Sequence, residues 1–413
     1  MKYDIIMLGL SITSSWGNGH ATTYRSLVRG LAARGHSILF LERDQPWYAG
    51  NRDEPHPAGA TTVLYESVDD LIANYEREVR DASLVILGSF VPEGIRVGEW
   101  VASAARGRTA FYDIDTPVTL GKLAAGEREY ISPELIRRLD MYLSFTGGPA
   151  LRHIESEYGS PMARVLYCSV DTNLYRPVIR PYHWDLGYLG TYSDDRQPVL
   201  DSLMLEPARR WKEGRFAVVG PMYPEGIRWP ANVFREIHLS PRQHPSFYAE
   251  QRFTLNVTRA AMKRAGYSPS VRLFEAGACA APVISDAWDG LDSLFTIGRE
   301  VLVAENAEDS LRYLQDTSDS DRRAIGDAAR RRILAEHTPE CRAIQLEGYL
   351  KEANDNVSAP APRRNRRHRE VDHGLEAGLA SERQRPATGG AAGKASGTGA
   401  APGDLHQPAG AGG

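Results

Sequence analysis

The order of apolar and polar stretches near the N-terminus limits the possible folds more than any other feature of the chain. An apolar run at 3–10 is followed by a polar loop with glycines, a helical pattern over about 20–33, and a second apolar run, SILFLE, at 37–42. A strand, a loop, a helix and a strand in this order predict a right-handed parallel βαβ unit. The first run lacks the small-residue pattern of a signal-peptide cleavage site, so we interpret it as a buried strand.

The same alternation continues along the chain and then restarts. Short apolar runs that predict further strands occupy 83–89, 109–114, 141–146 and 164–170, before a stretch rich in proline and arginine near 177–181. Beyond it, strands are expected at 186–192, 215–220, 252–257, 282–285 and 300–304, and helices near 198–212, 270–280 and 307–316, with one or two more within 320–353. This alternation predicts an α/β fold with two doubly wound domains, which we place at 1–178 and 179–355.

From about residue 355 the composition changes to arginine and then to Gly, Ala, Ser and Pro. The segment 356–413 holds too few large apolar residues to offset the entropy of ordering, so we expect a disordered, basic and Gly/Ala-rich tail. Its arginine cluster at 363–369 could make peripheral contact with an anionic membrane or with nucleic acid. A solvated tail is the favoured interpretation.

Composition excludes several classes of protein. The chain has 413 residues and a formal net charge of −4, which gives no electrostatic reason to expect nucleic acid as a partner. Three scattered cysteines are too few for a disulfide framework or a zinc site, and they are compatible with a reducing cytoplasm. No apolar run of about 18 residues occurs, so we expect no membrane span and a cytoplasmic location.

The segment 267–291 is the most informative one for function. It reads as an amphipathic helix that carries Glu275, a short apolar strand, and a loop of Asp and Gly. Ser268 and Ser270 lie just before the helix. A carboxylate on the first turns of a helix suits a ligand that offers sugar hydroxyls to the acid and phosphates to the helix N-terminus. A nucleotide-sugar is such a ligand.

The phrase FEAGACAAPVISD in this segment resembles the signature EAMAxGxPVI of GT-B glycosyltransferases of the group 1, family 4-like kind, and it is most similar to the spore-maturation CgeB-like branch. The resemblance implies two Rossmann-like domains facing a cleft, with the acceptor on the first and the donor on the second. It also implies transfer with retention and without a metal. Glu275 matches the second of two glutamates that are separated by seven intervening residues, which implies a hydrogen bond to the ribose. The first falls on Tyr267, so Asp286 or Asp289 could reach the sugar instead.

Cations near this helix could stabilise the charge of a leaving diphosphate. Arg259, Lys263 and Arg272 are the closest ones in sequence. We expect Arg272, on the same helix as Glu275, to contact phosphate. For Lys263 an exposed helix face is the alternative.

The loop 14–25 follows the first predicted strand and opens the first helix. Gly17 and Gly19 would let the backbone approach a ligand, but Thr22 stands where a dinucleotide fingerprint needs its third glycine. A tight turn with a capping hydroxyl is the alternative. The family resemblance implies that Gly19 and His20 contact donor phosphate or acceptor.

Two acids, Asp113 and Asp115, follow the strand at 109–114, where open α/β sheets bind ligands. Either could orient an acceptor hydroxyl, and we favour Asp115, although an Asp before Thr-Pro is often only a helix cap. His238 and His244 have no partner spaced for a metal, so we interpret both as hydrogen-bonded loop residues.

These features predict a glycosyltransferase of the hexosyltransferase type that uses a nucleotide-sugar donor, no metal and no further cofactor. Its acceptor is unknown and could be a glycan, a lipid, a protein or a small metabolite. The predicted site residues are the catalytic Asp115, His20 and Arg272, the donor-binding Glu275, Ser270, Arg259, Lys263 and Asp286, and the acceptor or phosphate loop of Gly17, Gly19 and His20. One alternative is a non-catalytic nucleotide-sugar-binding protein of envelope or spore-coat assembly. Another is a GT-B epimerase or phosphorylase, although the lysine-rich cofactor motif of a phosphorylase is missing.

Overall fold

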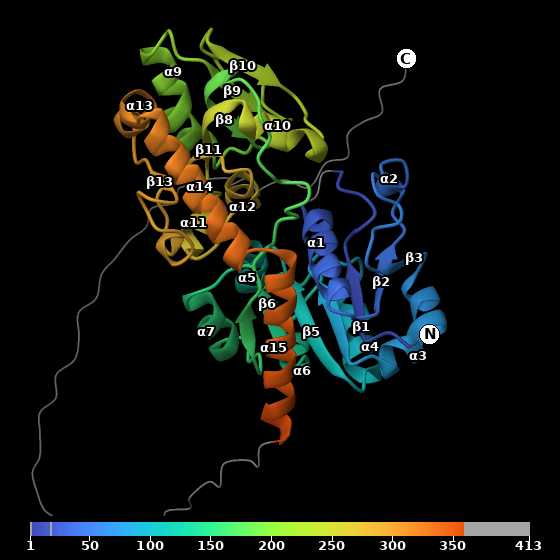
Figure 1. Cartoon of the computed structure of the whole chain (residues 1–413). Helices are drawn as coiled ribbons and strands as arrows, with labels where there is room; N and C mark the ends of the chain where they lie inside the picture. Colours follow the sequence, from blue (N-terminus) through green and yellow to red (C-terminus); the bar gives the residue numbers. More distant parts are fainter. Residues whose placement is uncertain (1, 17–18, 359–413) are drawn as a thin grey trace, which may run out of the picture. The chain divides into compact units, whose positions relative to one another are not determined.

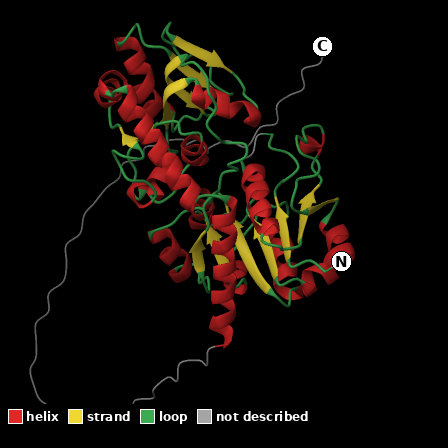
Figure 2. Ribbon diagram, in the orientation of Figure 1, coloured by secondary structure: helices red, strands yellow, loops and turns green. Residues whose placement is uncertain are grey.

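A computed structural model describes residues 2–16 and 19–358. Gly17 and the tail predicted to be disordered therefore lie outside the described residues, apart from the few tail residues before 359. Within the described part, the strands form two sheets in which every neighbouring pair is parallel (Figure 1, Figure 2).

The first sheet has the strand order β3-β2-β1-β4-β5-β6-β7. Its strands are β1 (Ile5–Gly9), β2 (Ile38–Arg43), β3 (Thr61–Tyr65), β4 (Leu84–Gly88), β5 (Arg108–Asp113), β6 (Met141–Ser144) and β7 (Ala163–Val165). The second sheet has the order β10-β9-β8-β11-β12-β13. Its strands are β8 (Trp184–Leu189), β9 (Phe216–Val219), β10 (Val233–Glu236), β11 (Gln251–Asn256), β12 (Val283–Ser285) and β13 (Leu302–Val303).

Helices cover both sheets. Those between the strands of the first sheet are α1 (His20–Ala33), α2 (Pro46–Ala49), α3 (Val68–Asp81), α4 (Gly94–Ala104), α5 (Thr116–Ala124), α6 (Pro133–Arg138) and α7 (Pro149–Ser156). Those that follow are α8 (Gln197–Leu200), a π-helical turn (Asp201–Leu205), α9 (Glu206–Arg210), α10 (His244–Ala249), α11 (Ala260–Ala265), α12 (Val271–Ala278), α13 (Ala307–Asp316), α14 (Asp319–Glu336) and α15 (Pro339–Ser358).

The strands predicted from apolar runs are confirmed, and two strands, β3 and β10, were not among them. β1 and β4 are buried along their whole length, which is why their apolar runs were clear in the sequence. β3 is the edge strand beside β2, and it is exposed or half-buried except at Tyr65. An edge strand of this kind has little apolar signal, so the sequence did not reveal it.

The last helix lies against the first half of the chain. α15 packs on α1, where a Cβ added at Gly30 would lie 2.2 Å from the backbone oxygen of Pro339. Arg34 also donates from Nε and Nη2 to the Glu347 carboxylate at 2.8 and 2.7 Å. The domain limits at 178 and 355 stay predictions, but by its contacts α15 belongs with the first sheet.

Both sheets reverse their strand order at one point. The first reverses between β1 and β4, and the second between β8 and β11. In open α/β sheets the loops at the carboxyl ends of the strands that flank such a point bind the ligand. The loops after β1, β4, β8 and β11 are therefore the places to look for a site, together with the loop after β5, the neighbour of β4.

Candidate active site

The loop after β1 leads into the N-terminus of α1. Gly19, the residue before α1, has no side chain that could cap the helix. The first turn of α1 holds no acidic residue. His20, the first residue of α1, is only 6% exposed. The predicted loop residues Gly19 and His20 therefore lie at the reversal point of the first sheet.

His20 pairs with Asp115, which follows β5. His20 Nε2 lies 3.2 Å from Asp115 Oδ2, and the Asp115 side chain is 43% exposed. An ionised carboxylate only accepts, so in the neutral ring Nε2 carries the proton and Nδ1 keeps its lone pair. Nδ1 is buried and has no hydrogen-bond partner in the described structure. Burial raises the pKa of Asp115, but the hydrogen bond and charge of His20 and the charge of Arg259 outweigh this and lower it below its usual value.

Asp113, the other acid of this segment, has a structural role. It is fully buried and accepts hydrogen bonds from the Tyr142 hydroxyl, from Thr119 Oγ1 at 2.8 Å and from the Asp115 amide at 3.3 Å. Burial raises the pKa of Asp113 to about 6, although these hydrogen bonds favour its charged form. Asp113 thus fixes the turn that presents Asp115.

A pocket beside Asp115 is lined from both halves of the chain. The first half contributes Ile114, Asp115, Pro117 and Val118, and the second half contributes Arg259, Ala261, Met262 and Ser268. The structure therefore brings together two of the predicted residues, the carboxylate of Asp115 and the cation of Arg259.

At the reversal point of the second sheet, the guanidinium of Arg272 lies between the ends of β8 and β11. Arg272 is 7% exposed, and it donates from Nε to the Leu189 carbonyl at 2.6 Å and from Nη1 to Asn256 Oδ1 at 3.0 Å. It also lies 4.7 Å from the centre of the Tyr188 ring. All these partners are neutral, so the positive charge of Arg272 is not compensated by its own contacts.

Arg196, which we did not predict, adds a second cation that is half-buried. It follows β8 and donates from Nε to Ser193 Oγ at 2.9 Å. Burial lowers the pKa of Arg196, and the charges of Arg272 and Arg259 lower it further, which shows that the three cations are neighbours. The signal that could have revealed Arg196 was its position: polar residues directly after a buried strand at a reversal point.

Lys263 and Asp286 form an ion pair. Lys263 Nζ lies 3.6 Å from Asp286 Oδ2, and Asp286 Oδ1 accepts from the amide and the hydroxyl of Thr258 at 3.1 and 2.8 Å. Burial raises the pKa of Asp286, although Thr258 and Lys263 favour its charged form. Lys263 therefore carries less uncompensated charge than Arg272, and Asp286 mainly anchors the end of β11 to the end of β12.

Glu275 lies on α12 among aromatic and imidazole groups. The Tyr248 hydroxyl donates to Glu275 Oε2 at 3.2 Å, and His244 Nδ1 lies 4.0 Å from the same oxygen. One helical turn earlier, Ser270 donates to Asn256 Oδ1 at 2.6 Å, the oxygen that Arg272 also contacts. The structure thus places Ser270 beside Arg272 and leaves Glu275 one turn further along. His244 is hydrogen-bonded, as expected, but it is the first residue of α10 and not a loop residue, and Tyr248 was missed.

Tyr267, which occupies the place of the family's first glutamate, is part of the packing. Its backbone has φ +48°, and a Cβ added at Gly148 or at Gly290 would lie 2.4 Å from its ring. The Tyr267 carbonyl accepts from the amide of Gly147 at 2.9 Å and from the hydroxyl of Tyr167 at 3.2 Å. The ring thus fills a space between two glycines, one from each half of the chain.

The described residues contain neither a cluster of metal ligands nor a helix that could span a membrane. Within residues 2–16 and 19–358, no group of three or more His, Cys, Asp or Glu side chains is placed to hold a metal ion. No helix in this part of the chain is long and apolar enough to cross a membrane. Metal-independent activity and a cytoplasmic location stay predictions.

Comparisons with known proteins agree with this architecture. The two parallel α/β sheets match solved GT-B glycosyltransferases, so the chain has the GT-B fold. Sucrose-phosphate synthase from Thermosynechococcus elongatus has a TM-score of 0.61 and 15% identity, with 86% of this chain and 100% of that chain covered. HepE from Anabaena, in complex with UDP and glucose, has a TM-score of 0.60 and 13% identity over 85% of this chain and 100% of that chain. An alpha-glucosyltransferase in complex with UDP-glucose and DNA has a TM-score of 0.63 and 11% identity over 84% and 98%.

The sequence itself supports part of this likeness. Residues 196–348 match the model of a family described as glycosyl transferase-like. This match covers the half that contains Arg196, Arg259, Arg272 and Glu275. No curated protein matches the sequence. The narrower likeness to the CgeB-like branch stays a prediction.

Proposed function

We propose that this protein is a glycosyltransferase that moves a sugar, of the hexose type, from a nucleoside-diphosphate sugar to an acceptor hydroxyl. The observation that carries the proposal is the group of cations at the reversal point of the second sheet. Among the described residues, Arg196, Arg259 and Arg272 form no ion pair with a carboxylate, although Arg272 is buried. Burying a cation without a counter-charge is costly, and a diphosphate would supply that charge.

In the proposed reaction, the bond between the sugar's anomeric carbon and the diphosphate oxygen breaks, and its electron pair leaves with the diphosphate. Arg272, Arg196 and Arg259 would stabilise the negative charge that grows on this leaving group. The acceptor oxygen forms the new bond to the anomeric carbon and gives up its proton to an oxygen of the departing diphosphate. Glu275 would accept hydrogen bonds from the ribose, and Ser270 lies beside the cations at the N-terminus of α12.

Asp115 would accept a hydrogen bond from the acceptor hydroxyl in this scheme. Because its pKa is below the usual value, Asp115 is a weak base that orients the hydroxyl better than it deprotonates it. A positioned hydroxyl and a stabilised leaving group are what a retaining transfer needs. We therefore propose retention, as the family resemblance implies, and proton NMR of the anomeric signal of the first product tests it.

A second candidate function is nucleotide-sugar binding without transfer, as in a component of envelope or spore-coat assembly. Tyr267 favours this alternative, because a packed ring stands where an acid would contact the donor sugar. The cation group would serve both functions. Only turnover separates them.

Calorimetry with UDP, GDP and their sugars tests the proposed site, using the wild type, Arg272→Gln and the control Arg264→Gln. Arg264 is an exposed residue of α11 near the same site. Losing a charge-assisted hydrogen bond costs about 1.5–3 kcal/mol, so Arg272→Gln should weaken the best ligand about tenfold or more. Equal affinity in all three proteins would contradict the diphosphate site. Binding without release of nucleoside diphosphate, with any acceptor offered, would favour the binding-protein alternative.

A further inference from the structure

Two tryptophans on the first half of the chain are exposed in segments that follow neighbouring strands of the first sheet. Trp16, in the loop between β1 and α1, is 47% exposed, and Trp47, on α2 just after β2, is 52% exposed. Single exposed apolar residues are normal, but neighbouring ones at a ligand-binding edge indicate a contact surface. β1 and β2 are adjacent parallel strands, so both tryptophans follow the same edge of the sheet.

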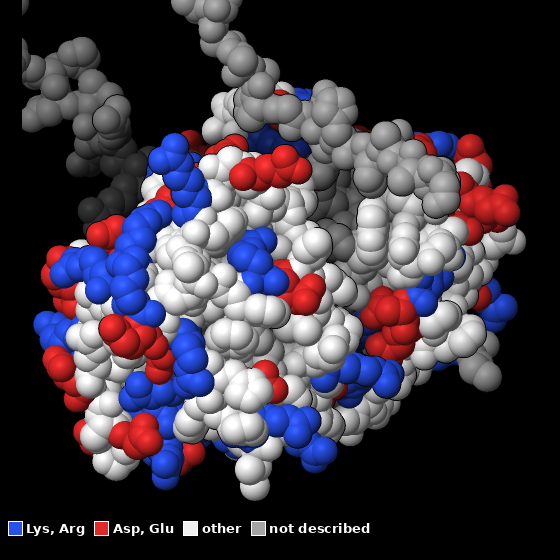
Figure 3. Space-filling view, turned by 90° about the horizontal axis from the view of Figure 1, so that it is seen from above, with Lys and Arg blue, Asp and Glu red and all other residues white. Residues whose placement is uncertain are grey.

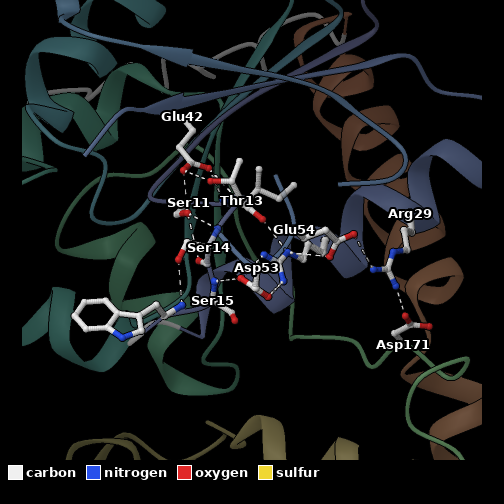
Figure 4. A network of polar contacts seen from close by, with 12 residues as sticks. Ser11, Thr13, Ser14, Ser15, Arg29, Glu42, Asp53, Glu54 and Asp171 are labelled. Carbon is white, nitrogen blue, oxygen red and sulfur yellow. Dashed lines mark hydrogen bonds and ion pairs between the residues drawn. The ribbon is translucent and has the colours of Figure 1, made fainter. Parts of the chain in front are cut away.

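The segment that carries Trp16 is held rigidly. Glu42, at the end of β2 and fully buried, accepts hydrogen bonds from the amides of Ile12 and Thr13 at 2.7 and 3.0 Å, and from the hydroxyls of Ser11 and Thr13 at 3.0 and 2.7 Å (Figure 4). Four hydrogen bonds to one carboxylate fix the path of the loop. The exposure of Trp16 is therefore not the result of a loosely held segment.

The same network joins the two tryptophans. Ser14 donates from Oγ to the Asn51 carbonyl at 2.6 Å and accepts from the Trp16 amide at 3.3 Å. Asn51 in turn donates from Nδ2 to the Trp47 carbonyl at 2.9 Å. The backbones of Trp16 and Trp47 are thus linked through one serine and one asparagine.

The charges around this surface have a consistent arrangement. Arg25 and Arg52 are largely buried, with side chains 10% and 15% exposed, and they pair with Asp53 and Asp44, whose side chains are 43% and 44% exposed. Burial raises the pKa of Asp53, but Arg25 and the amide of Ser15 outweigh this and lower it to about 2. The groups open to solvent here are therefore indole faces and carboxylates.

This combination favours one class of ligand. Because each carboxylate is paired with an arginine, this surface has little net charge to attract the anionic head groups of a membrane or the phosphates of nucleic acid, while the carboxylate oxygens can accept hydrogen bonds from hydroxyls. Indole faces offer a flat apolar surface to the C–H groups of a sugar ring. The face of the molecule in Figure 3 also shows acidic side chains beside basic ones over much of its area, without a field of one sign.

We propose that Trp16 and Trp47 form an acceptor subsite for a neutral saccharide, whose rings stack on the indoles while its hydroxyls reach Asp44 and Asp53. This inference rests on the proposed function, because it names the acceptor class for that reaction. Asp115 would then meet the hydroxyl of the saccharide's terminal residue, since His20, its partner, follows the Trp16 loop by a few residues.

Calorimetry with a panel of neutral oligosaccharides, in the presence and absence of UDP, tests the subsite. The proteins are the wild type, Trp16→Ala, Trp47→Ala, Trp47→Phe and the control Phe234→Ala, which removes an aromatic ring that is 46% exposed on β10. Each tryptophan deletion should weaken the best saccharide by about tenfold, with Trp47→Phe intermediate and Phe234→Ala unchanged. UDP affinity should be the same in all five.

The results that overturn the subsite differ from those that overturn the proposed function. If no saccharide in the panel binds at millimolar concentration, or if both deletions bind it as the wild type does, the subsite is wrong while UDP binding can still hold. If the wild type fails to bind any nucleotide, the proposed function fails, and tryptophan-dependent saccharide binding would stand alone. Sedimentation with anionic vesicles that is lost in Trp16→Ala and Trp47→Ala would replace the saccharide by a membrane surface.

Discussion

His337, which follows α14, should make the folded state sensitive to acid. It is 3% exposed, its Nδ1 accepts from Arg342 Nη2 at 2.6 Å, and its ring centre lies 4.7 Å from that of Phe274. Burial, together with the charges of Arg342 and Arg332, lowers the pKa of His337 to about 3. The ring must therefore stay neutral in the folded protein.

The sign and size of the effect follow from linkage. An unfolded histidine has a pKa of about 6.5, so below that pH the unfolded chain binds a proton that the folded protein does not. The stability contributed by neutral His337 is complete above pH 6.5 and is lost as the pH falls from 6.5 towards 3. At about pH 5 the loss amounts to about 2 kcal/mol, and the full loss is about 4–5 kcal/mol.

Other groups titrate in the same range, so the measurement must be a difference between two proteins. Asp113 acts in the opposite direction: burial raises its pKa to about 6, so its contribution is lost as the pH rises through this value. His337→Asn keeps an acceptor for Arg342 and cannot titrate, and Asp113 is present in both proteins. The free energy of unfolding in urea is measured for each at neutral pH and at about pH 5. The wild type should lose about 2 kcal/mol more than the variant, and parallel losses would refute the argument.

Three further predictions concern the site and its support. Asp115→Asn should lower kcat by on the order of a hundredfold while the affinity for UDP stays constant, as calorimetry and product release can show; unchanged turnover would remove Asp115 from the chemistry. Gly30→Val should cost about 1–3 kcal/mol in urea unfolding, because the added side chain meets the backbone of Pro339, and full stability would mean that α15 shifts freely. Activity should persist in excess EDTA, since no metal-ligand group lies among the described residues, and loss of activity with rescue by Mn²⁺ would require a metal.

The strands were predictable where burial on both faces produced a continuous apolar run. β1 and β4 are of this kind, and the order of strands and helices was enough to predict two parallel sheets. The edge strand β3 was not predictable, because its exposed face lets polar residues replace the apolar pattern. The partner of α15 was not predictable either: periodicity identifies the buried face of a helix and not the surface that covers it.

Among the site residues, position along the sheet was a better guide than residue type. His20 and Asp115 come from elements far apart in sequence, yet both follow strands of the first sheet, and the structure joins them at 3.2 Å. Arg196 was missed because no motif marks it. Lys263 and Asp286 were predicted as separate donor contacts, and the structure shows them within 3.6 Å of each other, which no linear pattern reveals.

Tyr267 stands where the glycosyltransferase motif has its first glutamate, and the residues around it are adapted to its ring. Gly148 has φ +58° and Gly290 has φ +91°, and at either position a Cβ would collide with the Tyr267 ring. The tyrosine is thus accommodated by two glycines that L-residues would replace only with strain. Tyr267→Glu would restore the acid of the motif but leave the space between these glycines empty, so lost stability would accompany any gain in sugar contact. In the proposed function, a donor sugar would therefore be recognised with this ring in place.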